Sequence, residues 1–228
     1  MTDPAQDTSP GTYPIEPFAA QVAHDLNNFL TGILGNLELM QNRARRLGVT
    51  DFDTYLEGAR HAGNRAAWFT QRLFAFSGHG AQVSAPVDLA AVTRDMIEPM
   101  RAAGITIDTE LEAGAKIFCD AAQAEMALQE LLDNAAEAAG RNGRIVLHIE
   151  ITEKLVVISV TDDGPGMEPD TLRRATEPFF STRASGAGKG LGLAIVERFA
   201  RRSGGVLELV STPGQGTTAR LRLPTITP

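Results

Sequence analysis

The chain has 228 residues, of which 43% are hydrophobic, and this is enough for one or two globular domains with buried cores. The formal net charge is -7 and no long block of Lys and Arg occurs, which excludes a dedicated nucleic-acid-binding protein. The single cysteine, Cys119, excludes an internal disulfide framework and a CxxC metal site, and its apolar neighbours predict a buried strand.

The first 16 residues are rich in Pro, Thr, Asp and Gly without any periodicity, which predicts a flexible tail. They lack the basic and apolar regions of a signal peptide, and no apolar run elsewhere approaches the length of a transmembrane helix. We therefore expect a soluble, cytoplasmic protein without membrane contact, and we interpret residues 1–16 as too short for a sensor domain.

Two long helices are predicted in residues 17–80. The first spans about residues 17–47 and ends at Gly48, a residue type that commonly closes a helix. The second carries apolar residues at three- and four-residue spacings from about residue 51 to residue 76. The short connection predicts an antiparallel hairpin. Because one hairpin has too little core to bury both apolar faces, we expect a homodimeric four-helix bundle.

The first helix separates an apolar stripe from a polar strip that carries His24. At about 100° per residue His24 lies roughly 200° from Val22, with Asn28 near it, so the imidazole faces away from the core. An exposed histidine is available for chemistry, although this helix alone also fits an ordinary surface histidine. The apolar stripe consists of Val22, Leu26, Phe29, Ile33, Leu37 and Met40.

Residues 81–228 show a mixed α/β pattern. Helices are expected over about 88–103, 120–140 and 191–202, and strands over about 105–111, 116–119, 144–152, 155–161, 206–212 and 217–223. Asp120 and Gln123 resemble a capping box at the start of the second of these helices. The pattern predicts an α/β sandwich in which about five strands are covered on one face by three helices, so the fold class is α+β.

Two short motifs in this second domain have polar side chains suited to a nucleotide. Glu130 and Asn134 are four residues apart on one helical face, where an amide oxygen suits Mg²⁺ and a carboxylate can polarise water. In TDDGPGM a strand ends at Asp162, and Gly164 and Gly166 allow a tight turn beside a carboxylate that can accept a hydrogen bond from an adenine amine. Each motif alone also fits a polar helix face or a common Asp-Gly turn.

A third motif, EPFFSTRASGAGKGLGLAIV, alternates glycines directly before a helix. Backbone N–H groups and the helix N-terminus can therefore face a phosphate chain. Arg183 and Lys189 would add positive charge, and Phe179 and Phe180 are expected to anchor a lid, although a core contact explains one of them equally well. No strand leads into the glycines, which excludes a Rossmann fold. In a fourth motif, PGQGTTARL, Thr217 follows a turn and can reach the same pocket.

Together, in this order and spacing, these elements resemble the transmitter core of sensor histidine kinases of bacterial two-component systems, over about residues 18–223. HDLNNFLT resembles the H box, in the HDFNN-like form of soluble and hybrid kinases. The resemblance implies a dimerisation and histidine phosphotransfer hairpin, followed by a catalytic ATP-binding domain of the Bergerat type. The other matching boxes are Asn134 (N box), Asp162, Gly164 and Gly166 (first G box), Pro178, Phe179 and Phe180 (F box), and Gly188, Gly190 and Gly192 (second G box).

The resemblance implies a role for each matching residue. His24 would take the γ-phosphoryl group of ATP, Asp25 would hold the other ring N–H, and Asn28 would orient water for dephosphorylating the partner protein. Glu130 would assist catalysis by polarisation, and Asn134 would bind Mg²⁺. The nucleotide-binding residues implied are Asn134, Asp162, Gly164, Gly166, Phe179, Phe180, Arg183, Gly188, Lys189, Gly190, Leu191, Gly192 and Thr217.

Three features depart from the usual pattern of this family. Phe29 replaces a proline that often follows the H box, which predicts a first helix without the usual kink. Glu137 stands where many members have a lysine, so Arg183 or Lys189 is expected to supply that charge. We also expect no sensor domain in the chain, so input would come from a partner or a separate sensor protein, or not at all.

Three hypotheses follow for the function. The first is an ATP-dependent protein histidine kinase that autophosphorylates His24 and passes the phosphoryl group to an Asp of a response-regulator receiver domain, with an associated phosphatase activity. The second is a dimeric phosphotransfer or scaffold protein with an inactive ATP-binding domain. The third is an ATP-driven conformational switch that never phosphorylates histidine; the H-box hairpin argues against it.

Overall fold

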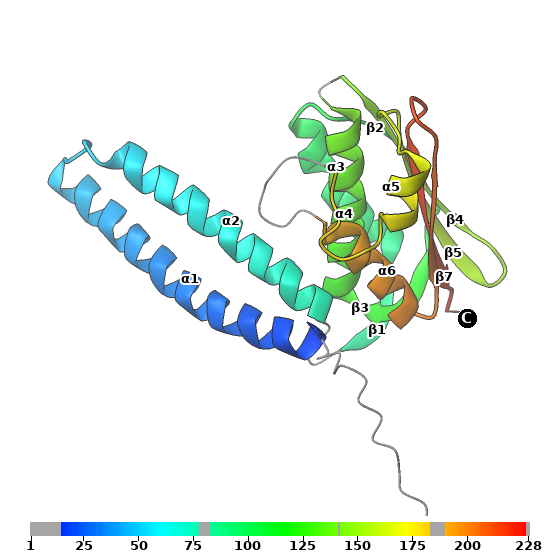
Figure 1. The fold of residues 1–228 in the computed structure, drawn as a ribbon, viewed down its shortest axis with the longest axis horizontal. Helices are drawn as coiled ribbons and strands as arrows, with labels where there is room; N and C mark the ends of the chain where they lie inside the picture. The colour runs from blue at the N-terminus through cyan, green and yellow to red at the C-terminus, as the bar shows by residue number, and fades with distance from the viewer. Residues whose placement is uncertain (1–14, 78–82, 141, 183–189, 227–228) are drawn as a thin grey trace, which may run out of the picture. The chain divides into compact units, whose positions relative to one another are not determined.

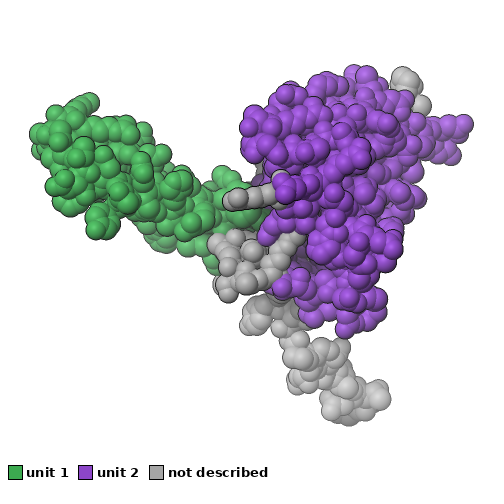
Figure 2. Space-filling view, turned by 90° about the horizontal axis from the view of Figure 1, so that it is seen from above, with its two compact units in different colours: residues 1–79 green, residues 80–228 purple. Residues whose placement is uncertain are grey.

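The computed structural model describes residues 15–77, 83–140, 142–182 and 190–226. The chain divides into two compact units, residues 1–79 and residues 80–228 (Figure 2). The expected elements are present in the expected order, with helices first and a mixed sheet after them (Figure 1). The predicted α+β fold class is confirmed. Among the described residues, no helix is both long enough and apolar enough to cross a membrane.

The N-terminal unit is a hairpin of α1 (Ile15–Leu47) and α2 (Asp53–Ser77). Gly48 closes α1 as predicted. It has a φ of 68°, its N–H donates to the Arg45 carbonyl at 3.2 Å, and the N–H of Val49 donates to the Ala44 carbonyl at 3.0 Å. This is a Schellman cap, which satisfies carbonyl groups that the end of a helix leaves unpaired. The helix α1 runs through Phe29 without interruption.

The two helices of the hairpin pack through a seam next to the predicted apolar stripe. A Cβ atom on Gly63 would lie 2.6 Å from the Leu34 side chain, so the glycine allows the helices to approach closely. Further along, Arg60 donates to Gln41 at 2.6 Å. Only the start of the stripe packs against α2, where Val22 contacts the cluster of Ala23 and Leu73. The stripe members Leu26, Phe29, Ile33 and Met40 remain 37% to 66% exposed in the single chain.

The C-terminal unit is built on a five-stranded sheet in the order β2-β4-β5-β7-β6, in which β2 and β4 are parallel and all other neighbours antiparallel. Three helices cover one face of the sheet, as predicted (Figure 1). The strands are β2 (Thr106–Leu111), β4 (Arg144–Ile151), β5 (Leu155–Asp162), β6 (Val206–Ser211) and β7 (Thr217–Pro224), and the covering helices are α3 (Leu89–Ala102), α4 (Ala121–Ala139) and α6 (Gly192–Arg202).

The core of this unit lies between the sheet and the helices. Strand residues alternate between buried and exposed positions, as in β4, where Ile145, Leu147 and Ile149 are almost completely buried. They belong to one cluster with the apolar face of α4. Helix α4 begins at the predicted cap, because the Asp120 carboxylate accepts the N–H of Gln123 at 3.1 Å. The sheet and α4 therefore form a rigid support for the polar residues at their ends.

Strand β1 (Ser84–Asp88) and helix α5 (Pro169–Arg174) were not predicted from the sequence, and the predicted strand over 116–119 lies outside the main sheet. This strand, β3 (Lys116–Asp120), pairs with β1 in a separate two-stranded sheet. The short helix α5 lies between the TDDGPGM and EPFFSTRASGAGKGLGLAIV motifs, where no helix is predicted. Cys119 is buried on β3, as expected, and this burial, with a smaller effect of the Asp120 charge, raises the pKa of its thiol to about 11.

Candidate functional site

His24 and its neighbour Asp25 form an exposed pair on α1. The imidazole Nδ1 lies 3.2 Å from Asp25 Oδ1, and the two side chains are 65% and 53% exposed. When Nδ1 carries the ring proton it donates to the carboxylate, and Nε2 then keeps its lone pair. The predicted position of His24 on a polar, accessible strip agrees with the structure. The pair can present a neutral, nucleophilic ring nitrogen to solvent.

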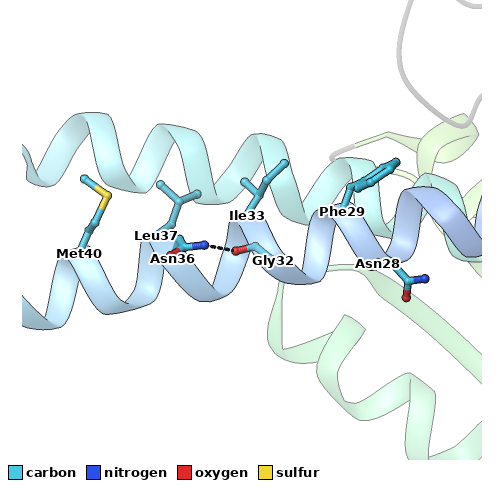
Figure 3. Close-up of a pocket in the computed structure, with 7 residues that line it drawn as sticks. All are labelled: Asn28, Phe29, Gly32, Ile33, Asn36, Leu37 and Met40. Carbon is cyan, nitrogen blue, oxygen red and sulfur yellow. Dashed lines mark hydrogen bonds between the residues drawn. The ribbon is translucent and has the colours of Figure 1, made fainter.

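Asn28 is exposed one helical turn after His24. It borders a shallow groove along α1 whose other residues are Phe29, Gly32, Ile33, Asn36, Leu37 and Met40. In Figure 3 the large apolar side chains of the groove project from one side of the helix, and Asn28 points to the other side. The amide therefore belongs to the polar strip and is separated from the apolar stripe.

In the C-terminal unit, Glu130 and Asn134 lie one turn apart on α4. The side chain of Glu130 is buried, whereas Asn134 is half-buried, and its Nδ2 is enclosed without a hydrogen-bond partner among the described residues. An unsatisfied buried N–H donor is costly, so a ligand with an acceptor atom would complete the Nδ2 of this carboxamide. Its oxygen is a hard ligand of the kind that Mg²⁺ takes. No cluster of three His, Cys, Asp or Glu occurs in the described parts of the chain, and Mg²⁺ bound to nucleotide phosphates commonly uses only one or two protein ligands.

Asp162 ends β5 with a side chain that is only 6% exposed. Its Oδ1 accepts the N–H of Gly164 at 2.9 Å, which fixes the turn after the strand. A Cβ atom on Gly164 would lie 2.7 Å from both the Asp162 carboxylate and the Ala138 carbonyl oxygen at the end of α4. Only glycine therefore allows this loop and the helix to come so close together.

The turn between β6 and β7 packs against the same loop. The N–H of Gly214 donates to the Pro165 carbonyl at 2.7 Å, and a Cβ atom on Gly166 would lie 2.1 Å from the Thr212 carbonyl oxygen. Thr217, the first residue of β7, is paired with Asp162 across the two strands. The structure therefore brings together the predicted residues Asp162, Gly164, Gly166 and Thr217 at one end of the sheet.

Phe179 and Gly190, eleven positions apart in the chain, contact each other through their backbones. The N–H of Phe179 donates to the Gly190 carbonyl at 2.7 Å, and both residues have a positive φ, 66° and 83°. A positive φ is costly for a residue such as phenylalanine and occurs where the surrounding structure holds it. Leu191 is fully buried and Gly192 starts α6. The predicted residues Arg183, Gly188 and Lys189 lie outside the described residues.

Two further residues of this region, Arg174 and Ser211, were not predicted from the sequence to belong to the site. The guanidinium of Arg174 lies 4.0 Å from the centre of the Phe180 ring and donates to Glu177 at 2.9 Å. Ser211, at the end of β6, bonds to the loop after β5 and to Thr217. The three-residue spacing of Arg174 and Glu177 is a local signal. Ser211 has no local signal, because its partners are set by strand pairing.

Residues 119–227 match the family described as histidine kinase-, DNA gyrase B- and HSP90-like ATPases. Over 90% of its length the chain is also 31% identical to the sensor kinase CckA of Brucella abortus. The chain carries a histidine kinase transmitter core with an ATP-binding domain. It spans only 24% of the length of the Brucella protein, so that protein is much longer than the described core.

Solved structures agree with the assignment as a histidine kinase transmitter core. Full-length ShkA in complex with AMPPNP is 27% identical, with a TM-score of 0.75 over 93% of this chain and 46% of that one. The mycobacterial sensor histidine kinase MprB is 28% identical, with a TM-score of 0.56 over 62% of this chain and 97% of that one. The chain therefore has the fold that these kinases share.

Proposed function

We propose that this transmitter core is an ATP-dependent protein histidine kinase that phosphorylates His24 and passes the phosphoryl group to an Asp of a response-regulator receiver domain. One observation carries the proposal: His24 is exposed with its Nδ1 against a carboxylate, in a chain that also has an ATP-binding domain. A histidine held in this way has one ring nitrogen free for nucleophilic attack.

The chemistry at His24 is a displacement at phosphorus. The Nε2 lone pair forms a bond to the γ-phosphorus of ATP, and the bond from that phosphorus to the bridging oxygen breaks, so its electrons leave with ADP. The ring keeps its Nδ1 proton and becomes positively charged. The carboxylate of Asp25 beside Nδ1 stabilises this charge. In a second displacement, a carboxylate oxygen of the receiver Asp attacks the phosphorus and His24 leaves as neutral imidazole.

The nucleotide would be held by the residues at one end of the sheet and α4. Asp162 would accept a hydrogen bond from the adenine amine, with Thr217 beside it. Asn134 would hold Mg²⁺ through its amide oxygen, and the ion would neutralise charge on the phosphates. The Nδ2 of Asn134, which lacks an acceptor among the described residues, would donate to a phosphate oxygen. Glu130, one turn earlier, would polarise a group near the phosphates. Arg183 or Lys189 would supply the positive charge that Glu137 cannot.

Asn28 would give the protein a second activity toward its partner. Its amide is exposed on the polar strip, one turn from His24. An amide in this position could orient water for hydrolysis of the phosphorylated receiver Asp. The apolar stripe on α1 supports a homodimer. We further propose that the protein acts in the cytoplasm and takes its input from a separate sensor protein.

The decisive experiment incubates the chain with γ-labelled ATP and Mg²⁺ and tests the product for acid-labile, base-stable phosphate. We expect label in the wild type and none in His24→Ala or Asn134→Ala. His61→Ala is the matched control, because His61 is an exposed histidine on α2 and should leave labelling unchanged. Label that persists in His24→Ala would refute the assigned nucleophile.

An unlabelled wild type that still binds ATP would favour the alternative, a dimeric phosphotransfer or scaffold protein with an inactive ATP-binding domain. The phosphatase proposal has its own test. We expect Asn28→Ala to keep autophosphorylation and to slow the loss of phosphate from a phosphorylated receiver. An unchanged rate of receiver dephosphorylation would remove the role proposed for Asn28.

A further inference from the structure

Ser211 joins three segments of the nucleotide site through one hydroxyl group. Its Oγ lies 2.8 Å from the backbone nitrogen of Met167, 3.0 Å from the Gly216 carbonyl oxygen and 2.9 Å from Thr217 Oγ1. Met167 belongs to the loop after β5, and Gly216 to the turn between β6 and β7. The hydroxyl is thus the common point of the loop, the turn and the strand that shape this end of the sheet.

The three hydrogen bonds of Ser211 can coexist in one arrangement of protons. A hydroxyl has one proton and two lone pairs. The carbonyl of Gly216 only accepts, so it takes the Ser211 proton, and the N–H of Met167 only donates, so it occupies one lone pair. The second lone pair then accepts the proton of Thr217. Thr217 is left with lone pairs alone for any further partner.

Thr217 lies beside a second acceptor, the carboxylate of Asp162. The two residues are paired across β5 and β7, so their side chains are on the same face of the sheet. The neighbours Val160 and Ala219 on that face are buried under the helices. Two adjacent acceptors favour a ligand group that offers two protons, such as an amino group. They oppose a carbonyl, whose lone pairs would face theirs.

We infer that Ser211 is a specificity-determining residue that acts through Thr217. By accepting the Thr217 proton, it makes the site prefer a purine with an amino group at position 6 over a purine with an oxo group there. Ser211 acts as a positioning residue and does not itself touch the base. The inference rests on the proposed ATP-dependent function and deepens it. Without the Ser211 hydroxyl, Thr217 regains a proton that it can donate to an oxo group.

The test compares ADP with inosine diphosphate, which carries an oxo group at position 6, by calorimetric titration of the full chain. The readout is the ratio of the two dissociation constants. We expect Ser211→Ala to reduce the preference for ADP about three- to tenfold, the effect of one hydrogen bond. Ser211→Thr keeps a hydroxyl and should therefore retain the wild-type preference for ADP. Thr217→Val should reduce it as Ser211→Ala does, with no further loss in the double variant.

Thr218→Ala is the control, because it removes a hydroxyl pair between the same two strands, with Thr161 at 3.0 Å, on the opposite face. It should leave the ratio unchanged. Equal weakening of both nucleotides in Ser211→Ala, or additive effects in the double variant, would overturn the inference. Should Ser211→Ala fail to melt cooperatively, an unchanged ratio in Thr217→Val overturns it. A wild type that binds neither nucleotide refutes the proposed function as well, whereas an unchanged ratio refutes only the inference.

Discussion

At the scale of single residues, the contact between His24 and Asp25 sets which ring nitrogen can react. Adjacent residues on a helix normally point in different directions, yet here the ring and the carboxylate meet at 3.2 Å. The carboxylate accepts a proton only from Nδ1, so it selects the tautomer in which Nε2 is the nucleophile. An amide in its place could also donate to Nδ1 and so favour the unreactive tautomer.

We therefore predict that Asp25→Asn slows autophosphorylation about 100-fold, which is the lower end of the effect of a positioned proton-holding group. The affinity for ATP should not change, because Asp25 lies in the hairpin unit and the nucleotide residues lie in the other. The measurement is the rate of label incorporation at saturating ATP. Glu38→Gln removes the same charge from an exposed position of α1 and is the control. A rate within twofold of the wild type in Asp25→Asn would contradict the role of the carboxylate.

At the scale of elements, the turn between β6 and β7 has two glycines with different demands. Gly214 and Gly216 have φ values of 76° and 82°, which disfavour any other residue. A Cβ atom on Gly214 would meet open space, whereas on Gly216 it would lie 1.9 Å from the Asp162 carbonyl oxygen. At Gly214 the lack of a side chain serves only the turn conformation, whereas at Gly216 it also allows the turn to reach the nucleotide site.

We predict that Gly214→Ala costs about 1–2 kcal/mol of unfolding free energy, the price of a left-handed backbone, and keeps nucleotide binding. Gly216→Ala adds a backbone clash to the same strain and should cost about 3 kcal/mol or more. It should also abolish ADP binding, because Asp162 must move. Denaturant unfolding and ADP titration of both variants measure these effects. Equal binding by the two variants would show that the close approach at Gly216 does not position the site.

The stack of Arg174 on Phe180 gives a second prediction at this scale. The stack connects the end of α5 to Phe180, which follows the backbone hydrogen bond between Phe179 and Gly190. A cation–π contact of a partly exposed arginine contributes about 1 kcal/mol, so Arg174→Gln should weaken ATP binding about fivefold. Arg173→Gln is the control, since Arg173 forms an ion pair with Asp170 within the same helix. Similar losses of ATP affinity in both variants would indicate a general effect of charge.

The sequence predicted those elements whose signals are local. Asp120 and Gln123 are three residues apart, and Gly48 follows the last helical residue, so a cap could be read directly from the chain. Strand β1 was missed because Pro86 lies inside it, and a proline in a short strand is tolerated only where few ladder bonds are needed. Its partner residues on β3 lie 28 to 36 positions further along the chain, from Asp88 with Lys116 to Ser84 with Asp120. The contacts of Ser211 likewise depend on strand register, which local patterns do not contain.

At the scale of the whole molecule, the two units differ in how completely each buries its apolar residues. The described part of the C-terminal unit has one extensive core formed by the sheet and its helices. In the described part of the hairpin, one small core cluster is formed by Ala23 and Leu73 with Val22 against them, and Leu56 and Phe76 are also buried. The apolar stripe on α1 meanwhile remains exposed over more than three helical turns. An exposed apolar surface of this kind is typical of a protein–protein contact.

We predict that the stripe is the interface of a homodimer, and that Ile33→Glu produces a monomer. Burial of an isoleucine contributes at least about 1.5 kcal/mol, and a symmetric dimer loses it twice, so the dissociation constant should rise about 100-fold or more. Analytical ultracentrifugation over a range of concentrations measures it, and circular dichroism checks that the helices persist. Leu39→Glu is the control, because Leu39 is also exposed on α1 but lies roughly 100° away from the stripe. A wild type that stays monomeric would contradict the dimer, whereas a dimeric Ile33→Glu would place the interface on another face of the hairpin.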